Sequence, residues 1–295
     1  MNIIRHTKTW FAISLVVILA GLISLIIQGL NYDIEFAGGT MMQIDLHQTL
    51  SSNARLEEIV REISGDTNPQ VQAVAGSGGE TQISIKVKEI APSQIDELYL
   101  AIAEEYGLDT ETKADLVENT SISPTISSEM KRSALLSTII AGILMLLYIT
   151  FRFRNLSFGL SALIPLIHDV LIVIAIYTLF RIPVNNTFIV ALLTIVGYSI
   201  NNTIVVFDRI RENKRLYRPN ELDKLCDVSI EQTLGRSLGT SFTTIITVVL
   251  LFILGVQSLR WFALPLMVGI LAGTYSSLFI ASPVWYLLEQ KLHRH

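Results

Sequence analysis

Six long stretches of apolar residues constrain this 295-residue chain more than any other feature of its sequence. A helix needs about 20 apolar residues to cross the hydrocarbon core of a bilayer. Stretches of this kind cover residues 10–27, 134–151, 160–180, 188–207, 237–256 and 261–288. A cleaved signal peptide is the other interpretation of the first stretch, but its apolar core is too long and no small-residue cleavage site follows. The sequence therefore predicts an α-helical membrane protein with six spans.

Charge is distributed unevenly along the chain. Residues 28–132 contain 7 Lys/Arg and 18 Asp/Glu, whereas the remaining residues contain 15 Lys/Arg and 8 Asp/Glu. This pattern indicates one acidic, water-exposed insert between the first two spans. No segment has the solvated basic face that nucleic-acid binding requires, so we expect no nucleic-acid partner. The single cysteine, Cys226, excludes an intrachain disulfide and cysteine-rich metal sites, and we expect neither a metal nor a cofactor.

Lys and Arg in the short loops set the expected orientation, because these residues concentrate on the cytoplasmic side. They precede the first stretch, lie in the second–third and fourth–fifth loops, and follow the sixth stretch. Both termini are therefore expected in the cytoplasm. The predicted organisation is a cytoplasmic N-terminus with helix one (1–27), an extracytoplasmic domain (28–132), helices two to four (133–207), a cytoplasmic loop with an amphipathic segment (208–236), and helices five and six with the C-terminus (237–295).

The insert shows alternating strand and helix patterns. Strands are predicted around residues 42–46, 71–74, 82–87 and 115–121, with the middle two joined by a hairpin at residues 76–79. Helices are predicted from Ser51 or Ser52 to Ile63, and from Pro92 to the residue before Gly107. The order β-α-β-β-α-β is that of a ferredoxin-like domain. No nucleophile–base pair or group of metal ligands is found in this insert.

Asp169 is the carboxylate that the sequence places within the hydrocarbon. It follows His168 near the middle of the third stretch, four residues after Pro165. An Asp at the centre of a span costs about 2.5–3.5 kcal/mol on insertion scales, so such a residue is expected to be functional. Burial favours its neutral form and allows it to exchange a proton near neutral pH. The structural alternative is a neutral or paired Asp that only holds helices together.

Polar residues also follow faces of the fourth and fifth stretches. Thr194, Tyr198 and Asn202 recur at every fourth position with Ser199 beside them, whereas Asn201 points about 100° away. The fifth stretch begins with Arg236 and contains hydroxyls at Ser237, Thr240, Ser241, Thr243, Thr244 and Thr247. Simple packing is the alternative for the hydroxyls, because Ser and Thr bond their own backbone in membranes. Together with the third stretch, however, these faces predict a hydrated path. Gly269 and Gly273 predict a helix-contact face in the sixth.

Several of these residues form motifs of a known family. The motifs are residues 33–40 (DIEFAGGT), the pair His168-Asp169, residues 197–201 (GYSIN), residues 205–212 (VVFDRIRE) and residues 232–237 (QTLGRS). With them the chain resembles the SecD/SecF family over nearly its whole length. The resemblance implies half of an RND-type transporter in the bacterial inner membrane, paired with six spans of SecD. It also implies the SecYEG translocon, YajC and a translocating preprotein as partners, with the proton-motive force promoting protein export.

The resemblance also assigns residues to a proton path. Asp169 and Arg236 would belong to it together with Asn202, which replaces the Asp usual in the family and cannot titrate. His168, Tyr198, Ser199, Asn201 and Thr240 would be supporting polar residues. In the first motif, Glu35, Phe36, Gly38 and Gly39 match, with Glu35 in place of Asp and Asp33 in place of the first Gly.

Two other functions remain as alternatives. An intramembrane serine protease would use Ser199 as nucleophile and His168 as base, but the sequence shows nothing that would supply an oxyanion hole. A non-conducting scaffold would use the spans only to stabilise SecD and the translocon, and Asn202 is the feature that favours it. The expected function remains a proton-driven export subunit rather than an enzyme.

Overall fold

The computed structural model describes residues 2–48, 52–67, 69–75, 81–153, 155–255 and 257–292. The chain divides into two compact units. The membrane unit combines Met1–Asn31, Ala134–Gly255 and Leu259–His295, and the external unit is built on Tyr32–Ser133. The prediction that one insert separates the first helix from the other five agrees with this division.

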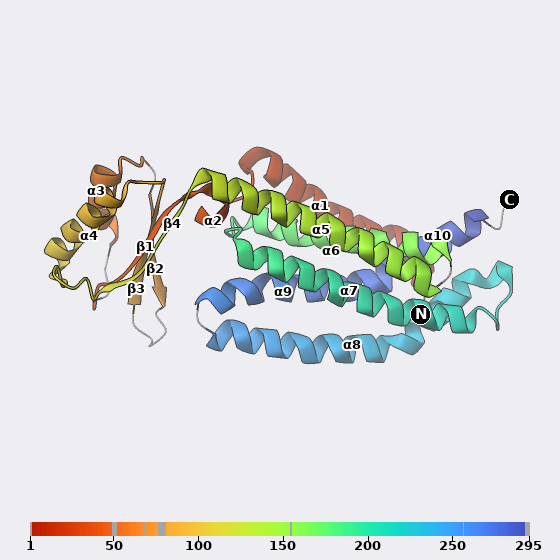
Figure 1. Cartoon of the computed structure of the whole chain (residues 1–295). Coiled ribbons are helices and arrows are strands. Elements are labelled where there is room, and N and C mark those ends of the chain that lie inside the picture. The colour runs from red at the N-terminus through yellow and green to blue at the C-terminus, as the bar shows by residue number, and fades with distance from the viewer. Residues whose placement is uncertain are drawn as a thin grey trace. The chain divides into compact units, whose positions relative to one another are not determined.

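The six predicted spans are confirmed as six long apolar helices among the described residues. They lie side by side in the membrane unit (Figure 1). The helices are α1 (Thr7–Gln28), α5 (Pro124–Phe153), α6 (Leu156–Leu179), α7 (Asn186–Asn213), α8 (Leu222–Leu254) and α9 (Gln257–Ser276). The last continues through a π-helical turn (Ser277–Ala281) into α10 (Ser282–Leu292). The sequence does not predict this turn.

The fifth span differs from the prediction. The sequence predicts a separate amphipathic helix at the membrane surface before Arg236, whereas α8 is one helix of 33 residues that includes this segment. Gly235 interrupts the pattern but costs only about 1 kcal/mol in a helix interior, and no proline stops the helix. The apolar residues Leu225, Cys226 and Ile230 are buried in the bundle instead of lying on a membrane surface.

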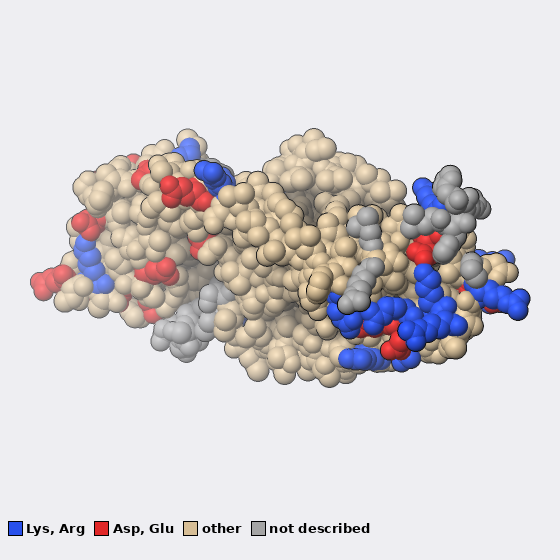
Figure 2. Space-filling model, turned by 45° about the vertical axis from the view of Figure 1, so that its right-hand side comes forward, with Lys and Arg blue, Asp and Glu red and all other residues tan. Residues whose placement is uncertain are grey.

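Aromatic residues close the bundle at the end where α6 begins. Phe158 stacks on Phe153 and Trp285 at ring distances of 5.0 and 5.2 Å, and meets the edge of Phe207 at 5.2 Å. Lys and Arg side chains gather at this end, where α7 ends and α8 begins, whereas the middle of the unit is free of charge on the face that Figure 2 shows. This distribution is typical of a bundle whose middle lies in hydrocarbon.

The external unit contains one four-stranded sheet in the order β2-β3-β1-β4, with all neighbours antiparallel. The strands are β1 (Gly39–Asp45), β2 (Gln70–Ala75), β3 (Thr81–Val87) and β4 (Leu116–Ile122). Helices α3 (Ala54–Ser64) and α4 (Pro92–Tyr106) lie along the sheet (Figure 1). The element order is the one that the sequence predicts for a ferredoxin-like domain. The hairpin predicted at residues 76–79 lies outside the described residues.

The sheet begins at a glycine whose hydrogen atom faces another strand. Gly39 has a φ of 144°, and a Cβ there would lie 2.4 Å from the carbonyl oxygen of Val87. A side chain would therefore meet backbone that cannot move without breaking the pairing of β1 with β3. Position 39 therefore requires glycine, both because of this close approach and because of its positive φ.

We expect Gly39→Ala to lower the free energy of unfolding of the external unit by about 2–4 kcal/mol, through backbone strain and steric overlap. Hydrogen exchange of the β1 and β3 amides in the full chain measures this loss. Gly107→Ala is the matched control, because Gly107 has a φ of 71° but no atom within 4 Å of the added Cβ. Equal protection in Gly39→Ala and the wild type would contradict the prediction.

Candidate functional site

Asp169 lies fully buried in α6 and is held by side chains from three helices. Its Oδ2 accepts hydrogen bonds from the hydroxyl of Ser199 on α7 at 2.5 Å and of Ser276 on α9 at 2.8 Å. Its Oδ1 lies 2.8 Å from Nδ1 of His168. An ionised carboxylate has enough lone pairs for all three partners. Both oxygens of the carboxyl group are therefore engaged.

His168 extends this network to the first helix. Its Nε2 lies 2.9 Å from the hydroxyl of Ser14 on α1, and the ring of Tyr275 stacks on it at 6.0 Å. Tyr275 donates from its hydroxyl to the carbonyl of Trp10, also on α1, at 2.8 Å. The polar chain from Ser14 to Ser276 thus joins helices α1, α6, α7 and α9.

Small residues bring these helices close enough for short side chains to meet. A Cβ on Gly273 of α9 would lie 3.1 Å from Cβ of Ser199 and 3.5 Å from Oδ2 of Asp169. A Cβ on Gly269 would lie 2.4 Å from the side chain of Ile195 on α7. Both glycines thus form the helix-contact face that their spacing predicts.

Ser14 and Ser276 are the residues of this network that sequence reasoning missed. Ser276 stands three residues after Gly273 on the contact helix, and this spacing is the signal that could have indicated it. Ser14 is a lone hydroxyl within an apolar helix, where most serines bond their own backbone. Only the packing of α1 against α6 shows that it faces His168.

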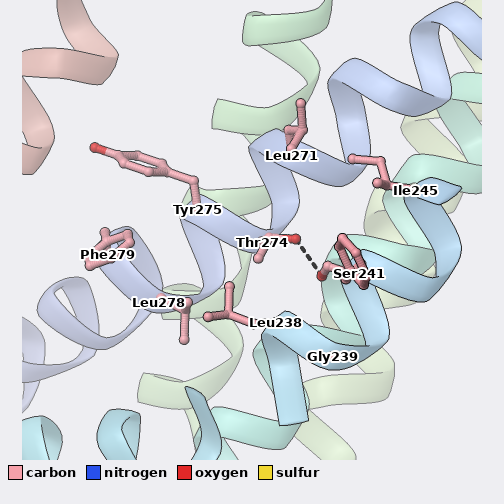
Figure 3. A pocket seen from close by; sticks show the side chains of 10 residues that line it. Leu238, Gly239, Ser241, Ile245, Leu271, Thr274, Tyr275, Leu278 and Phe279 are labelled. Carbon is pink, nitrogen blue, oxygen red and sulfur yellow. Dashed lines mark hydrogen bonds between the residues drawn. The ribbon is translucent and has the colours of Figure 1, made fainter. Parts of the chain in front are cut away.

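A second polar bridge joins α7, α8 and α9. The Tyr198 hydroxyl donates to the Ser241 hydroxyl at 3.1 Å, and Ser241 lies 2.6 Å from the hydroxyl of Thr274. Ser241 and Thr274 stand in the wall of a groove of about 610 Å³ between α8 and α9 (Figure 3). The other lining side chains that Figure 3 labels are apolar apart from the Tyr275 hydroxyl, so the groove itself offers no charge.

Arg236 and Asn202 are not brought to Asp169 in this chain. Within the described residues the side chain of Arg236 is exposed and makes no hydrogen bond or ion pair, and the buried Nδ2 of Asn202 has no partner. From the sequence, Asn202 can orient water or bond Asp169 or Arg236, and among the described residues it bonds neither of these two side chains. Ser199 takes that place, because Asn202 lies three residues, about 4.5 Å, further along α7.

The remaining predicted polar residues lie on an exposed side of α7 and α8. Asn201 is exposed, and Thr194 donates to the carbonyl of Val190. On α8, Thr240, Thr243 and Thr247 are exposed and Thr244 is half-buried, and all four donate to carbonyls of their own helix. Within the described residues, the strip formed by these four threonines does not bond other helices, although the sequence allows such bonds. It leaves polar groups and Arg236 on an uncovered face.

The arrangement does not favour a protease. Ser199 bonds Asp169 instead of His168, so the predicted nucleophile–base pair is not formed. Ser14, His168 and Asp169 do have the contacts of a Ser-His-Asp triad. However, Ser14 is only 6% exposed, and it lies within α1, whose backbone N–H groups are used in helical bonds. Such a chain of polar groups can hold or relay a proton but cannot receive a peptide.

The first family motif, residues 33–40, lies at the start of the external unit. Asp33 accepts from the backbone N–H of Ile34 at the start of α2 (Ile34–Ala37) and from Nζ of Lys86 on β3 at 2.7 Å. Phe36 of the motif is buried, and Glu35 is half-buried. Asp33, which replaces a family glycine, thus ties this segment to the sheet.

Six apolar helices around a buried carboxylate, with an α+β insert after the first, define a multi-pass membrane protein with an ionisable centre. The family described as Protein export membrane protein SecD/SecF, C-terminal, matches residues 102–291. The protein translocase subunit SecF of Alicyclobacillus acidocaldarius is 36% identical over 96% of this chain and 91% of its own length. That of Rhodothermus marinus is 37% identical over 95% of this chain and 91% of its own. The chain belongs to the SecD/SecF family.

Solved structures agree with this assignment. The crystal structure of SecDF from Thermus thermophilus, a translocon-associated membrane protein, is similar with a TM-score of 0.85 and 32% identity. The match covers 99% of this chain and 39% of the SecDF chain. SecDF in a super-membrane-facing form is similar with a TM-score of 0.70 and 31% identity. The chain thus spans about two fifths of these larger proteins.

Proposed function

We propose that this chain is a SecF-type subunit of the Sec translocase accessory complex, which uses the proton-motive force with SecD to promote protein export. The observation that carries the proposal is the match to translocase subunits SecF over 91% or more of their length. The buried carboxylate supports the proton-driven part, because an ionisable residue inside a membrane bundle is costly and marks an ion pathway.

The exposed polar side of α7 and α8 supports pairing with SecD. Arg236 and the four threonines of α8 lie on a helix that is long and apolar enough to span the membrane. Lipid cannot satisfy a guanidinium, so this side needs a polar partner. Six spans of SecD are the proposed partner, since the matched SecDF chains are more than twice as long as this one.

Within this pair we propose that Asp169 binds and releases the transported proton. Arg236 and Asn202 complete the path with groups from SecD, and His168, Tyr198, Ser199, Asn201 and Thr240 support it. Asn202 contributes by orienting water or a partner side chain, since an amide does not titrate. Glu35, Phe36, Gly38 and Gly39 join the spans to the external unit. The proposed further partners are SecYEG, YajC and the translocating preprotein.

The proposed location is the bacterial inner membrane, with both termini in the cytoplasm and the external unit outside. Labelling of introduced cysteines with a membrane-impermeant maleimide tests this topology. Glu111→Cys in the external unit is expected to react in intact cells, and Asn220→Cys before α8 only after the membrane is opened. Both positions are exposed, whereas the native Cys226 is fully buried and does not compete. Reaction of both positions from the same side would contradict the topology.

Reconstitution tests the function itself. Vesicles that contain this chain, its SecD partner and SecYEG are expected to translocate preprotein faster when a proton gradient is imposed. Vesicles without this chain should show no such stimulation. If the chain accelerates translocation equally with and without a gradient, it is a scaffold and not a proton-driven subunit.

A further inference from the structure

Ser276 stands between the buried carboxylate and an irregular turn of the last span. It is the final residue of α9, and the π-helical turn Ser277–Ala281 begins immediately after it. π-helical turns are rare and are frequently found at functional sites. Ser276 is fully buried, so it contacts only protein groups.

The Ser276 hydroxyl has two acceptors within reach. One is Oδ2 of Asp169 at 2.8 Å, and the other is the carbonyl oxygen of Gly273 on its own helix at 3.3 Å. A hydroxyl has a single proton to donate, so it favours one acceptor at a time. The shorter contact to Asp169 is the one that links two helices. The longer contact keeps the hydroxyl within α9.

Protonation of Asp169 changes this choice. As a carboxylate, Oδ2 accepts from both Ser199 and Ser276. A proton on Oδ2 turns this atom into a donor, and one of the two hydroxyls must then accept. Ser276 has the carbonyl of Gly273 as a substitute acceptor, whereas Ser199 has no other hydrogen-bond partner among the described residues. The Ser276 hydroxyl is therefore the one expected to leave Asp169 and to donate to the carbonyl of Gly273 instead.

The turn beyond Ser276 leads to a part of the bundle far from Asp169. α10 follows the turn and packs Trp285 against Phe158 at the end of the bundle. Glu289 of α10 pairs with Lys214, which follows α7, at 2.5 Å. A change in the turn would therefore move contacts at the start of α6 and at the end of α7.

We propose that Ser276 is a positioning residue that transmits the charge state of Asp169 to the π-helical turn and so sets the position of α10. This inference rests on the proposed function for its biological meaning but not for its geometry. The other titratable side chains of the network are His168 on α6 and Tyr275 on α9, which stack on each other. The Asp169→Asn variant removes the carboxyl group but keeps His168 and Tyr275, so any pH response that remains in this variant comes from those two side chains.

Spin labels test the proposal in the complete complex with SecD, reconstituted in lipid vesicles. Phe180 at the end of α6 and Leu287 on α10 are exposed positions for the two labels. Their distance distribution is expected to shift between pH 8 and pH 6 in the wild type. The shift should be lost in Asp169→Asn and in Ser276→Ala.

Two further variants show whether the loss of the distance shift in Ser276→Ala comes from the missing hydrogen bond or from misfolding. Ser277→Ala is the matched control, because this fully buried neighbour donates only to the carbonyl of Thr274. It should keep the shift, and Ser276→Thr, which retains a hydroxyl, should restore it. A shift that persists in Ser276→Ala, or that is absent from the wild type, overturns the proposal.

Gradient-driven translocation, measured in the same vesicles, separates this proposal from the function. Stimulation without a Ser276-dependent shift means that the function stands and the inference fails. A Ser276-dependent shift without stimulation means that the inference stands and the proposed function fails.

Discussion

Asp169→Asn is expected to reduce gradient-driven translocation to the level measured without a gradient. Asparagine has nearly the same shape and can still accept from the hydroxyls of Ser199 and Ser276, but it cannot bind or release a proton. The bundle should therefore assemble while its coupling is lost. The measurement is the ratio of translocation rates with and without a proton gradient in vesicles that contain equal amounts of the complex.

Ser161→Ala is the matched control for this variant. Ser161 is equally buried on the same helix, but its hydroxyl donates only to the carbonyl of Ser157, at 2.6 Å. It should keep the wild-type ratio. Asn202→Ala, which removes a buried amide that has no partner for its Nδ2, should have a smaller effect than Asp169→Asn. Full stimulation in Asp169→Asn with loss in Asn202→Ala would place the coupling carboxylate on SecD.

Arg236→Ala is expected to lower gradient-driven stimulation at least about tenfold. A guanidinium stays charged at all physiological pH values, so in a span it has to be matched by an opposite charge or by water. This chain supplies no partner for it among the described residues, and the proposed partner is a group of SecD at the exposed side of α8. Removal of the charge would leave that group unmatched. Stimulation and co-purification of SecD, both measured in the same preparation, report the effect.

Thr240→Ala controls for the position of Arg236 on the helix surface. Thr240 lies one turn further along α8, is exposed, and donates to the carbonyls of Arg236 and Ser237 at 2.9 and 3.1 Å. Its loss removes a supporting hydroxyl from the same side without changing charge, so stimulation should fall much less than in Arg236→Ala. Wild-type stimulation in Arg236→Ala would remove Arg236 from the proton path.

The parts of this molecule that the sequence predicts are those set by periodic patterns. Hydropathy locates the spans because a bilayer imposes one minimum length on every helix. Alternating apolar positions and the glycines 65 and 107 locate the elements of the external unit. Asp169 is found because an acidic residue in hydrocarbon is costly and therefore rare.

The remaining features depend on contacts between helices. Whether Ser199 or Asn202 meets Asp169 depends on a shift of one turn along α7, and both lie on faces that the spacing allows. Ser14 becomes significant only when α1 packs on α6. The π-helical turn Ser277–Ala281 contains no proline or glycine, and Pro283 just beyond it frees the carbonyl of Phe279 but does not by itself specify a π-helical turn. Local sequence does not determine such features, because they depend on the fit of neighbouring helices.

The uninterrupted length of α8 has a mechanical consequence. At 1.5 Å per residue its 33 residues form a rod of about 50 Å, roughly 20 Å longer than the hydrocarbon core. Near its first turn, Asp227 accepts from the backbone N–H groups of Ile3 and Ile4 at 2.9 and 3.0 Å, which ties the start of the chain to the rod. A tilt of about 5° at that end displaces the other end by about 4 Å over this length. α8 can therefore act as a lever that carries a small rotation at one membrane surface to the opposite one.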